Sequence, residues 1–413
     1  GGEEQVVEAV APSGTWDGWL ASMATAADCP DVHLAVYASV ASVLVGRLGT
    51  ARGWVVDWSG ETSQGKTTAL RVAASVWGQP VDGRMLQSWR LTVSRAEGVA
   101  HLLSALPLIL DDSKNARSSR DVAGLIYQHS QGQAKGRAKP GAGAQSVGLR
   151  VSATWRSVKL STGEARATSF TEDAGARART LCMVGSPLPS AAIAQELTVG
   201  ALSHHGHLGP RVIAALQNGN ARDRYELAYA QTLKRMRDEL GAMGAVAGRL
   251  AEPIALLGLA AMVAEDAGLP APPEGVDPIR AAMNAAIEGG RDADRPAAAL
   301  VDIVGGAFST PTALYGRHEI VQGAPNVPAG GWIGAMVEGE HFYHIDLRCT
   351  WVKDQLIRRR YDVEGTISRW VERGWIDTGS GRGHQRTKRI DGLPHRVYRF
   401  KRAALRDVGM IED

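Results

Sequence analysis

The chain has 413 residues and a net charge of +3; 44% of its residues are hydrophobic and 22% are charged, as in globular proteins of about two to four domains. No apolar run reaches the roughly 18 residues of a membrane helix, and Cys29, Cys182 and Cys349 have neither disulfide nor zinc-ligand spacing. We therefore expect a cytoplasmic protein with no membrane partner and no structural metal. The first residue is Gly1 rather than methionine, which suggests a processed or excised chain and leaves open whether a further domain precedes it.

The first 190 residues predict two parts. Residues 15 to 48 are rich in Ala, Val and Leu and favour two helices, within an N-terminal helical segment of residues 1 to 50. Residues 51 to 190 alternate strand-like and helical runs, which is typical of an α/β core with a parallel sheet.

A complete G-x-x-x-x-G-K-T phosphate loop lies between a predicted strand at residues 54 to 58 and a predicted helix at 67 to 77. In such loops, backbone N–H groups and the helix N-terminus bind the phosphates of a nucleoside triphosphate. Lys66 is expected to reach the β- and γ-phosphates, and the Thr67 hydroxyl to hold Mg²⁺. The predicted ATP-binding residues are Gly60, Glu61, Thr62, Ser63, Gln64, Gly65, Lys66, Thr67 and Thr68.

A Walker B pattern follows at residues 106 to 112, where an apolar run ends in Asp111 and Asp112. We assign Asp111 to the Mg²⁺ water shell and Asp112 to orientation of the attacking water. Because aspartate is one methylene shorter than glutamate, the role of Asp112 as a base stays open. The alternative is a strand that ends in a solvated acidic turn.

A third predicted strand, residues 155 to 160, is followed by Ser161 and Thr162. A polar side chain at a neighbouring strand end can sense the γ-phosphate or its water, so both are candidates. The alternative is a plain strand-ending turn.

Three arginines are candidates for a transition-state contact from a neighbouring subunit, in the order Arg179, Arg137, Arg177. An arginine in such a position, taken singly, is more often a surface or structural residue.

Residues 191 to 304 predict a helical subdomain, with helices at 224 to 241 and 246 to 267, and residues 305 to 340 predict loops or a linker. His204, His205 and His207 lack further ligands nearby, so we interpret them as loop or helix-cap residues rather than a metal site. Arg249 could reach a nucleotide, although a solvated helix face fits it better.

Residues 341 to 413 predict a basic winged-helix-like domain. Between residues 346 and 402 there are 15 Lys and Arg against 7 Asp and Glu. Two helices are expected before a β-ribbon of residues 375 to 378 and 395 to 400, joined by a basic wing. Such cations can bind DNA phosphates; the competing interpretation is a module for subunit contacts. The predicted DNA-binding residues are Arg358, Arg359, Arg360, Arg382, Arg386, Lys388 and Arg389.

Several of these motifs together resemble the family called domain of unknown function 927. The similar segments are residues 60 to 77, 88 to 90, 97 to 98, 108 to 112, 132 to 137, 155 to 164 and 203 to 207. The resemblance implies a helicase-like P-loop ATPase of bacteria and phages, found with primase-type domains in mobile elements. Many members have Leu-Asp-Glu where this chain has Leu-Asp-Asp, which leaves the catalytic base in doubt.

These observations predict an α/β P-loop NTPase core with a RecA/AAA+-like parallel sheet, a helical subdomain and a C-terminal winged-helix-like domain. The leading functional hypothesis is an ATP- and Mg²⁺-dependent DNA translocase or replicative helicase of a phage or mobile element. Because one P-loop core supplies half of a site, we expect a homo-oligomeric ring, such as a hexamer, and a primase or another replication protein as partner. The alternatives are an ATPase switch or helicase loader and, disfavoured by the basic C-terminal end, a small-molecule kinase.

Overall fold

The computed structural model describes residues 2–47, 53–136, 152–171, 174–316, 328–337, 344–359, 361–378 and 384–411. Arg137, Arg360 and Arg382, which were singled out from the sequence, lie outside these residues. Contacts between residues divide the chain into two compact units, Gly1–Gly290 and Arg291–Asp413. The finer division into five segments stays a prediction.

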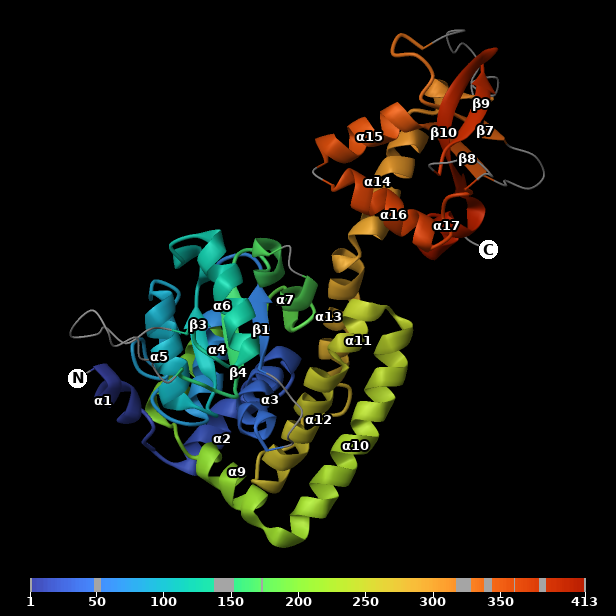
Figure 1. The fold of residues 1–413 in the computed structure, drawn as a ribbon. Helices are drawn as coiled ribbons and strands as arrows, with labels where there is room; N and C mark the ends of the chain where they lie inside the picture. Colours follow the sequence, from blue (N-terminus) through green and yellow to red (C-terminus); the bar gives the residue numbers. More distant parts are fainter. Residues whose placement is uncertain are drawn as a thin grey trace, which may run out of the picture. The chain divides into compact units, whose positions relative to one another are not determined.

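The first unit is built on a parallel sheet of five strands in the order β2-β3-β4-β1-β5. Figure 1 labels its central strands, β3, β4 and β1. The strands are β1 Trp54–Ser59, β2 Leu86–Ser88, β3 Leu108–Asp111, β4 Val158–Gly163 and β5 Thr180–Val184. Because all five are parallel, their carboxyl ends meet at one edge of the sheet. The phosphate loop follows β1 at this edge, and the Walker B carboxylates follow β3.

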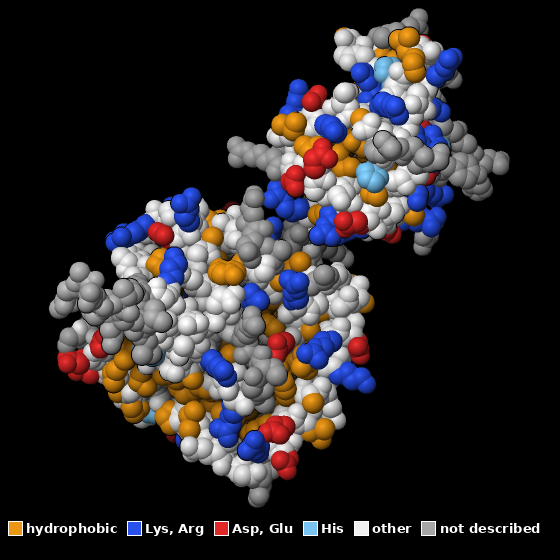
Figure 2. Space-filling view, viewed as in Figure 1, with side chains coloured by type: hydrophobic (Ala, Val, Ile, Leu, Met, Phe, Trp, Pro, Cys, Tyr) orange, Lys and Arg blue, Asp and Glu red, His pale blue; other side chains and the backbone are white. Residues whose placement is uncertain are grey.

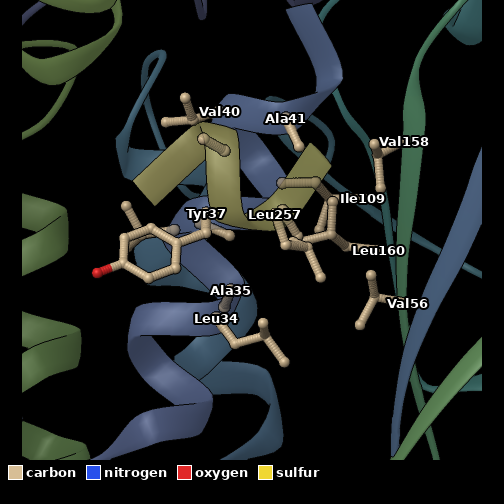
Figure 3. Close-up of a cluster of buried hydrophobic side chains, with 14 of the residues drawn as sticks. Leu34, Ala35, Tyr37, Val40, Ala41, Val56, Ile109, Val158, Leu160 and Leu257 are labelled. Atoms are coloured by element: carbon tan, nitrogen blue, oxygen red, sulfur yellow. The ribbon is translucent and has the colours of Figure 1, made fainter. Parts of the chain in front are cut away.

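Helices cover both faces of the sheet. One face presents aliphatic side chains such as Val56, Ile109 and Leu160, which pack against α3 and Leu257 of α12 (Figure 3). On the opposite face, Lys159 of β4 donates to the Leu125 carbonyl of α6. The helices before and around the sheet are α1 Gly2–Val7, α2 Trp16–Ala24, α3 Pro30–Val45, α4 Lys66–Ser75, α5 Val93–Leu103, η1 Ser113–Asn115, α6 Ser119–Gln131, η2 Ala167–Phe170 and α7 Ala174–Arg177.

A helical layer extends the first unit beyond α3. It comprises α8 Ala191–Ser203, α9 Leu208–Gln217, α10 Gly219–Ala242, α11 Ala245–Arg249, α12 Ala251–Asp266 and α13 Pro278–Ala293. Helix α12 packs against α3 on one side and α10 on the other, which explains why its side chains are buried nearly all round. The helices predicted at 224 to 241 and 246 to 267 correspond to α10, α11 and α12.

A short antiparallel backbone pairing links the segment after α6 to the segment before β4. Gln133 bridges Thr154, the Ala134 N–H donates to the Ala153 carbonyl at 2.8 Å, and the Trp155 N–H donates to the Gly132 carbonyl at 3.0 Å.

The second unit combines helices with a sheet in the order β6-β7-β8-β10-β9. Its buried core lies between one face of that sheet and the helices, and contains Leu347, Val352, Trp370 and Phe400. The elements are α14 Arg295–Phe308, η3 Pro311–Ala313, β6 Leu314–Tyr315, β7 Gly334–Val337, β8 His344–Arg348, α15 Cys349–Arg358, α16 Val363–Glu372, β9 Arg386–Ile390, β10 Leu393–Lys401 and α17 Arg402–Asp407.

The β-ribbon predicted in this unit is wrong in its first strand. Strand β10 pairs antiparallel with β9, and the segment at 375 to 378 contributes only the isolated bridge between Ile376 and Phe400. Asp391 and Gly392 have positive φ values of 51° and 75°, as a two-residue turn of type I′ requires. This Asp-Gly turn closes the hairpin, so the expected basic wing is largely strand β9 itself.

None of the helices in the described part of the chain combines the length and apolar character that crossing a membrane would require.

Candidate functional site

The phosphate-loop motif occupies the turn between β1 and α4. Gly65 precedes the helix with φ +85°, and a Cβ at this position would lie 2.6 Å from the Leu188 side chain. Only glycine fits both the backbone conformation and the close approach. The free N–H groups of the first turn of α4 therefore face the loop, where an anionic ligand would be stabilised.

Lys66 begins α4 and spans this loop. Its Nζ donates to the Gly60 carbonyl at 2.9 Å and to the Glu61 carbonyl. The side chain is only 9% exposed. Its positive charge is therefore held beside the loop backbone, where a bound phosphate would lie.

Asp111 joins the phosphate loop to the neighbouring strand end. Its Oδ1 accepts from the Thr67 hydroxyl at 3.0 Å and from the Thr162 hydroxyl at 2.6 Å. Thr162 Oγ1 in turn accepts from the Asp112 N–H at 2.9 Å. The hydroxyl of Thr67 and the carboxylate of Asp111 form an oxygen donor set of the kind that Mg²⁺ prefers, so these residues fit the expected ion.

Asp112 is held differently from Asp111. Its backbone has φ 60° and ψ 84°, and its Oδ1 accepts from the Lys114 N–H at 3.2 Å. Its Oδ2 accepts from Asn115 Nδ2 at 2.8 Å. Both carboxylate oxygens therefore have donors from η1, and Asn115 sets the orientation of the carboxyl group. Sequence reasoning missed Asn115; its only signal is its place three residues after the second carboxylate of the Walker B pair.

These groups line a cavity of about 490 Å³. The predicted residues in its wall are Thr62, Ser63, Gln64, Gly65, Lys66, Thr67, Thr68, Asp111, Asp112 and Thr162. Residues that we did not predict also line it: Asp82, Ser88, Asn115, Gly163, Glu164, Ala191 and Ala194. The Lys114 ammonium lies 3.0 Å from the Glu164 carboxylate beside the cavity.

Ser161 and Thr162 point to opposite sides of β4, as successive strand residues do. Thr162 lines the cavity, whereas Ser161 Oγ accepts from Trp89 Nε1 at 3.2 Å and also bonds Asp57. Burial raises the pKa of Asp57 to about 6, and burial lowers the pKa of Lys159 to about 7. Ser161 therefore belongs to a buried polar cluster behind the site, and only Thr162 is placed to contact a ligand.

Of the candidate arginines, Arg177 and Arg179 lie in the described part of the chain, and neither lines the cavity. Arg179 precedes β5, and its carbonyl accepts from the Val55 N–H near the start of β1. The phosphate loop is at the other end of these parallel strands, about 16 Å away at the usual rise per residue. Arg177 ends α7. The side chain of Arg179 therefore cannot reach the phosphate loop of its own chain.

The three histidines pack against the N-terminal segment. His204 Nδ1 accepts from the Thr15 N–H at 3.0 Å, and His207 Nε2 lies 2.9 Å from the Ser13 carbonyl. Ser13 and His205 form a β-bridge. Arg249 is exposed at the end of α11.

The predicted DNA-binding residues of the second unit fall into two groups. Arg386 forms an ion pair with Asp377 at 2.8 Å, and Arg359 donates to the Asp302 carbonyl at 2.6 Å, so both hold the fold together. Arg358 and Arg389 are exposed, and Lys388 is partly exposed. Arg396 of β10, which sequence reasoning missed, is also exposed.

The fold and this geometry define an α/β protein with a phosphate-loop site at the carboxyl edge of a parallel sheet. Residues 2–147 match the model of the family described as "Domain of unknown function (DUF927)", which confirms the resemblance inferred from the sequence. The match ends before residues 155–164 and 203–207, where the resemblance stays a prediction.

One solved structure with a similar fold is titled "SCCmec type IV Cch - active helicase". The likeness has a TM-score of 0.68 at 18% sequence identity, and covers 97% of this chain and 72% of that chain. At this identity it concerns the fold. No curated protein matches the sequence.

Proposed function

We propose that this protein is a Mg²⁺-dependent ATPase that acts on DNA, as a translocase or replicative helicase of a phage or another mobile element. The observation that carries the proposal is the chain of hydrogen bonds from Thr67 through Asp111 to Thr162 at the wall of the phosphate-loop cavity. It brings the two proposed Mg²⁺ ligands, Thr67 and Asp111, together at the cavity wall, with Thr162 bonded to Asp111.

Each side chain has a role in this proposal. The phosphate loop binds the triphosphate, and Lys66 offsets charge on the transferred phosphoryl group. Thr67 and Asp111 would hold Mg²⁺, which would neutralise charge on the phosphates. Thr162 orients Asp111, and Asp112 positions the attacking water.

Two observations support DNA as the partner. The similar fold that is titled an active helicase comes from an SCCmec element. In the second unit, the order β8, α15, α16, β9, β10, with β10 paired to both β8 and β9, is the arrangement expected of a winged-helix-like module. Its exposed Arg389 and Arg396 and its partly exposed Lys388 can neutralise phosphates.

A ring, such as a hexamer, is part of the proposal because Arg179 can reach a phosphate only in another subunit. We also propose a primase or another replication protein as partner, on the family resemblance alone.

The phosphate-loop assignment is tested by Lys66→Ala. We expect ATP turnover to fall at least about 100-fold while the fold survives, because the variant removes the cation beside the transferred group. Steady-state phosphate release measures the turnover, and thermal unfolding shows whether the variant is folded. Wild-type turnover in a folded variant would contradict the assignment.

The roles assigned to Asp111 and Asp112 are tested by replacing each carboxylate separately. Asp112→Asn should bind Mg²⁺-ATP and hydrolyse it slowly, whereas Asp111→Asn should lose metal-dependent turnover. If Asp112→Asn loses ATP binding and Asp111→Asn keeps metal-dependent turnover, the two roles are reversed.

A helicase loader or ATPase switch is the second candidate, favoured by the same site and the same basic unit. Strand displacement by the purified protein alone distinguishes a helicase from a loader, and ATPase stimulation by DNA distinguishes both from a small-molecule kinase.

A further inference from the structure

The β9–β10 hairpin carries an exposed apolar side chain at its tip. Leu393 follows the Asp391-Gly392 turn and is 64% exposed, more than any other large hydrophobic residue in the described part of the chain. Asp391 Oδ2 accepts from Trp332 Nε1 at 3.4 Å, which ties the turn to the body of the unit. The hairpin thus presents a leucine to solvent on an anchored turn.

Cations flank this leucine on both faces of the hairpin. Lys388 is opposite His395 on one face, while Arg389 and Arg396 are diagonal neighbours on the other. Lys388, Arg389 and Arg396 form no ion pair with an acidic residue among the residues that the structure describes. Figure 2 shows Lys and Arg side chains spread over this unit. The surroundings of Leu393 therefore favour a polyanion over an apolar protein surface.

Helix α16, which directly precedes the hairpin in the chain, is not suited to bind phosphates. Its exposed side chains are Glu364, Ser368, Arg369 and Glu372. The only cation among them, Arg369, is 2.8 Å from Glu372. A helix that enters the major groove needs donors and positive charge, so the hairpin is the better-equipped DNA contact in this unit.

We propose that the β9–β10 hairpin is a wedge for DNA junctions. Leu393 inserts into the base stack where duplex meets single strand, and Lys388, Arg389 and Arg396 bind the phosphates on either side. Apolar side chains inserted between base steps unstack them, and the neighbouring ionic contacts offset the cost. This inference rests on the proposed DNA function and adds the DNA structure that the unit recognises.

The test uses the full-length chain without ATP and a forked DNA duplex with 2-aminopurine in the last base pair before the fork. Fluorescence of this base rises when it unstacks. Wild-type protein should raise it at the fork, and should leave it unchanged in a second DNA with 2-aminopurine in the middle of the duplex. Leu393→Ser should lose more than half of the rise, while its Kd for the fork changes less than about threefold.

Two further variants make the result specific. Ile357→Ser removes an equally exposed apolar side chain, 62% exposed on α15 of the same unit, and should behave as wild type. Leu393→Met keeps an apolar tip and should retain the rise. Thermal unfolding checks that the variants are folded.

A full rise with Leu393→Ser, or equal losses with Leu393→Ser and Ile357→Ser, would overturn the wedge and leave the DNA function intact. No rise with wild-type protein that binds the fork would also overturn it. If wild-type protein binds no DNA, the proposed function fails, and the wedge fails with it.

Discussion

Asp111 and Asp112 are adjacent in the sequence but have different environments. Asp111 shares its Oδ1 between two threonine hydroxyls, Thr67 and Thr162, that line the cavity. Asp112 has a left-handed backbone, and its carboxylate is held by η1. A strained backbone at Asp112, next to a second carboxylate, suits a side chain whose direction must be fixed. We therefore regard Asn115 as the positioning residue for Asp112.

We expect Asn115→Ala to lower kcat for ATP about tenfold and to leave KM nearly unchanged, because the variant removes one hydrogen bond to a charged group. Asn115→Ser, which keeps a donor, should recover part of the rate. Steady-state kinetics separates kcat from KM. A raised KM at unchanged kcat would instead assign Asn115 to nucleotide binding.

At the scale of elements, β9 and β10 replace the wing that the sequence predicted. The structure removes Arg386 from the set of free cations through its ion pair with Asp377 and adds Arg396. The reason is register: Arg386 is at the start of β9, where Asp377 is within reach, whereas Arg389 and Arg396 lie closer to the tip. The DNA-contact hypothesis is therefore restated with Lys388, Arg389 and Arg396.

Replacing these three residues with Ala should weaken DNA binding and reduce the slope of log K against log salt by about 0.9 for each duplex phosphate that the variant no longer neutralises. Basal ATPase activity should hardly change, because the hairpin contributes no residue to the cavity wall. DNA binding titrated over salt concentration measures the effect. A control with the same change in net charge removes three exposed cations from α10, as Lys234→Ala, Arg235→Ala and Arg237→Ala. An equal reduction in the control would show that only net charge matters.

For the whole molecule, the direction of the parallel sheet decides what one subunit can do. Arg179 lies at the amino end of β5 and the phosphate loop at the carboxyl end of β1, so one chain cannot bring them together. The side chain of Arg179 has no ion pair with the other described residues and is partly exposed. This favours Arg179 as a group donated to a neighbouring subunit.

We expect Arg179→Ala and Lys66→Ala proteins to be inactive alone and to recover turnover when mixed, up to about a quarter of the wild-type rate in a randomly mixed ring. Recovery arises where an intact phosphate loop meets an intact Arg179 across an interface. Measuring ATPase activity over mixing ratios checks this. No recovery, with subunit exchange verified by fluorescence transfer, would exclude Arg179 as the donated group.

The sequence by itself located the phosphate-loop motif, the Walker B pattern and the strand that precedes each of them, β1 and β3. These features depend on local spacing: a glycine-rich turn between strand and helix, and an apolar run ending in acids, need no distant partner to be identified. The Asp391-Gly392 turn of the β9–β10 hairpin was an equally local signal that the sequence interpretation missed, and the first strand was therefore placed too early.

Only the tertiary structure decided which neighbours complete the site and which cations are free. Because side chains alternate along β4, Thr162 faces the cavity and Ser161 does not. The turn after β3 brings Asn115 to the Asp112 carboxylate. Arg386 was paired by Asp377, which is nine residues away along the chain. Hydrogen bonds and ion pairs depend on distances of a few ångströms between side chains, and those distances are set by strand pairing and packing rather than by residue type.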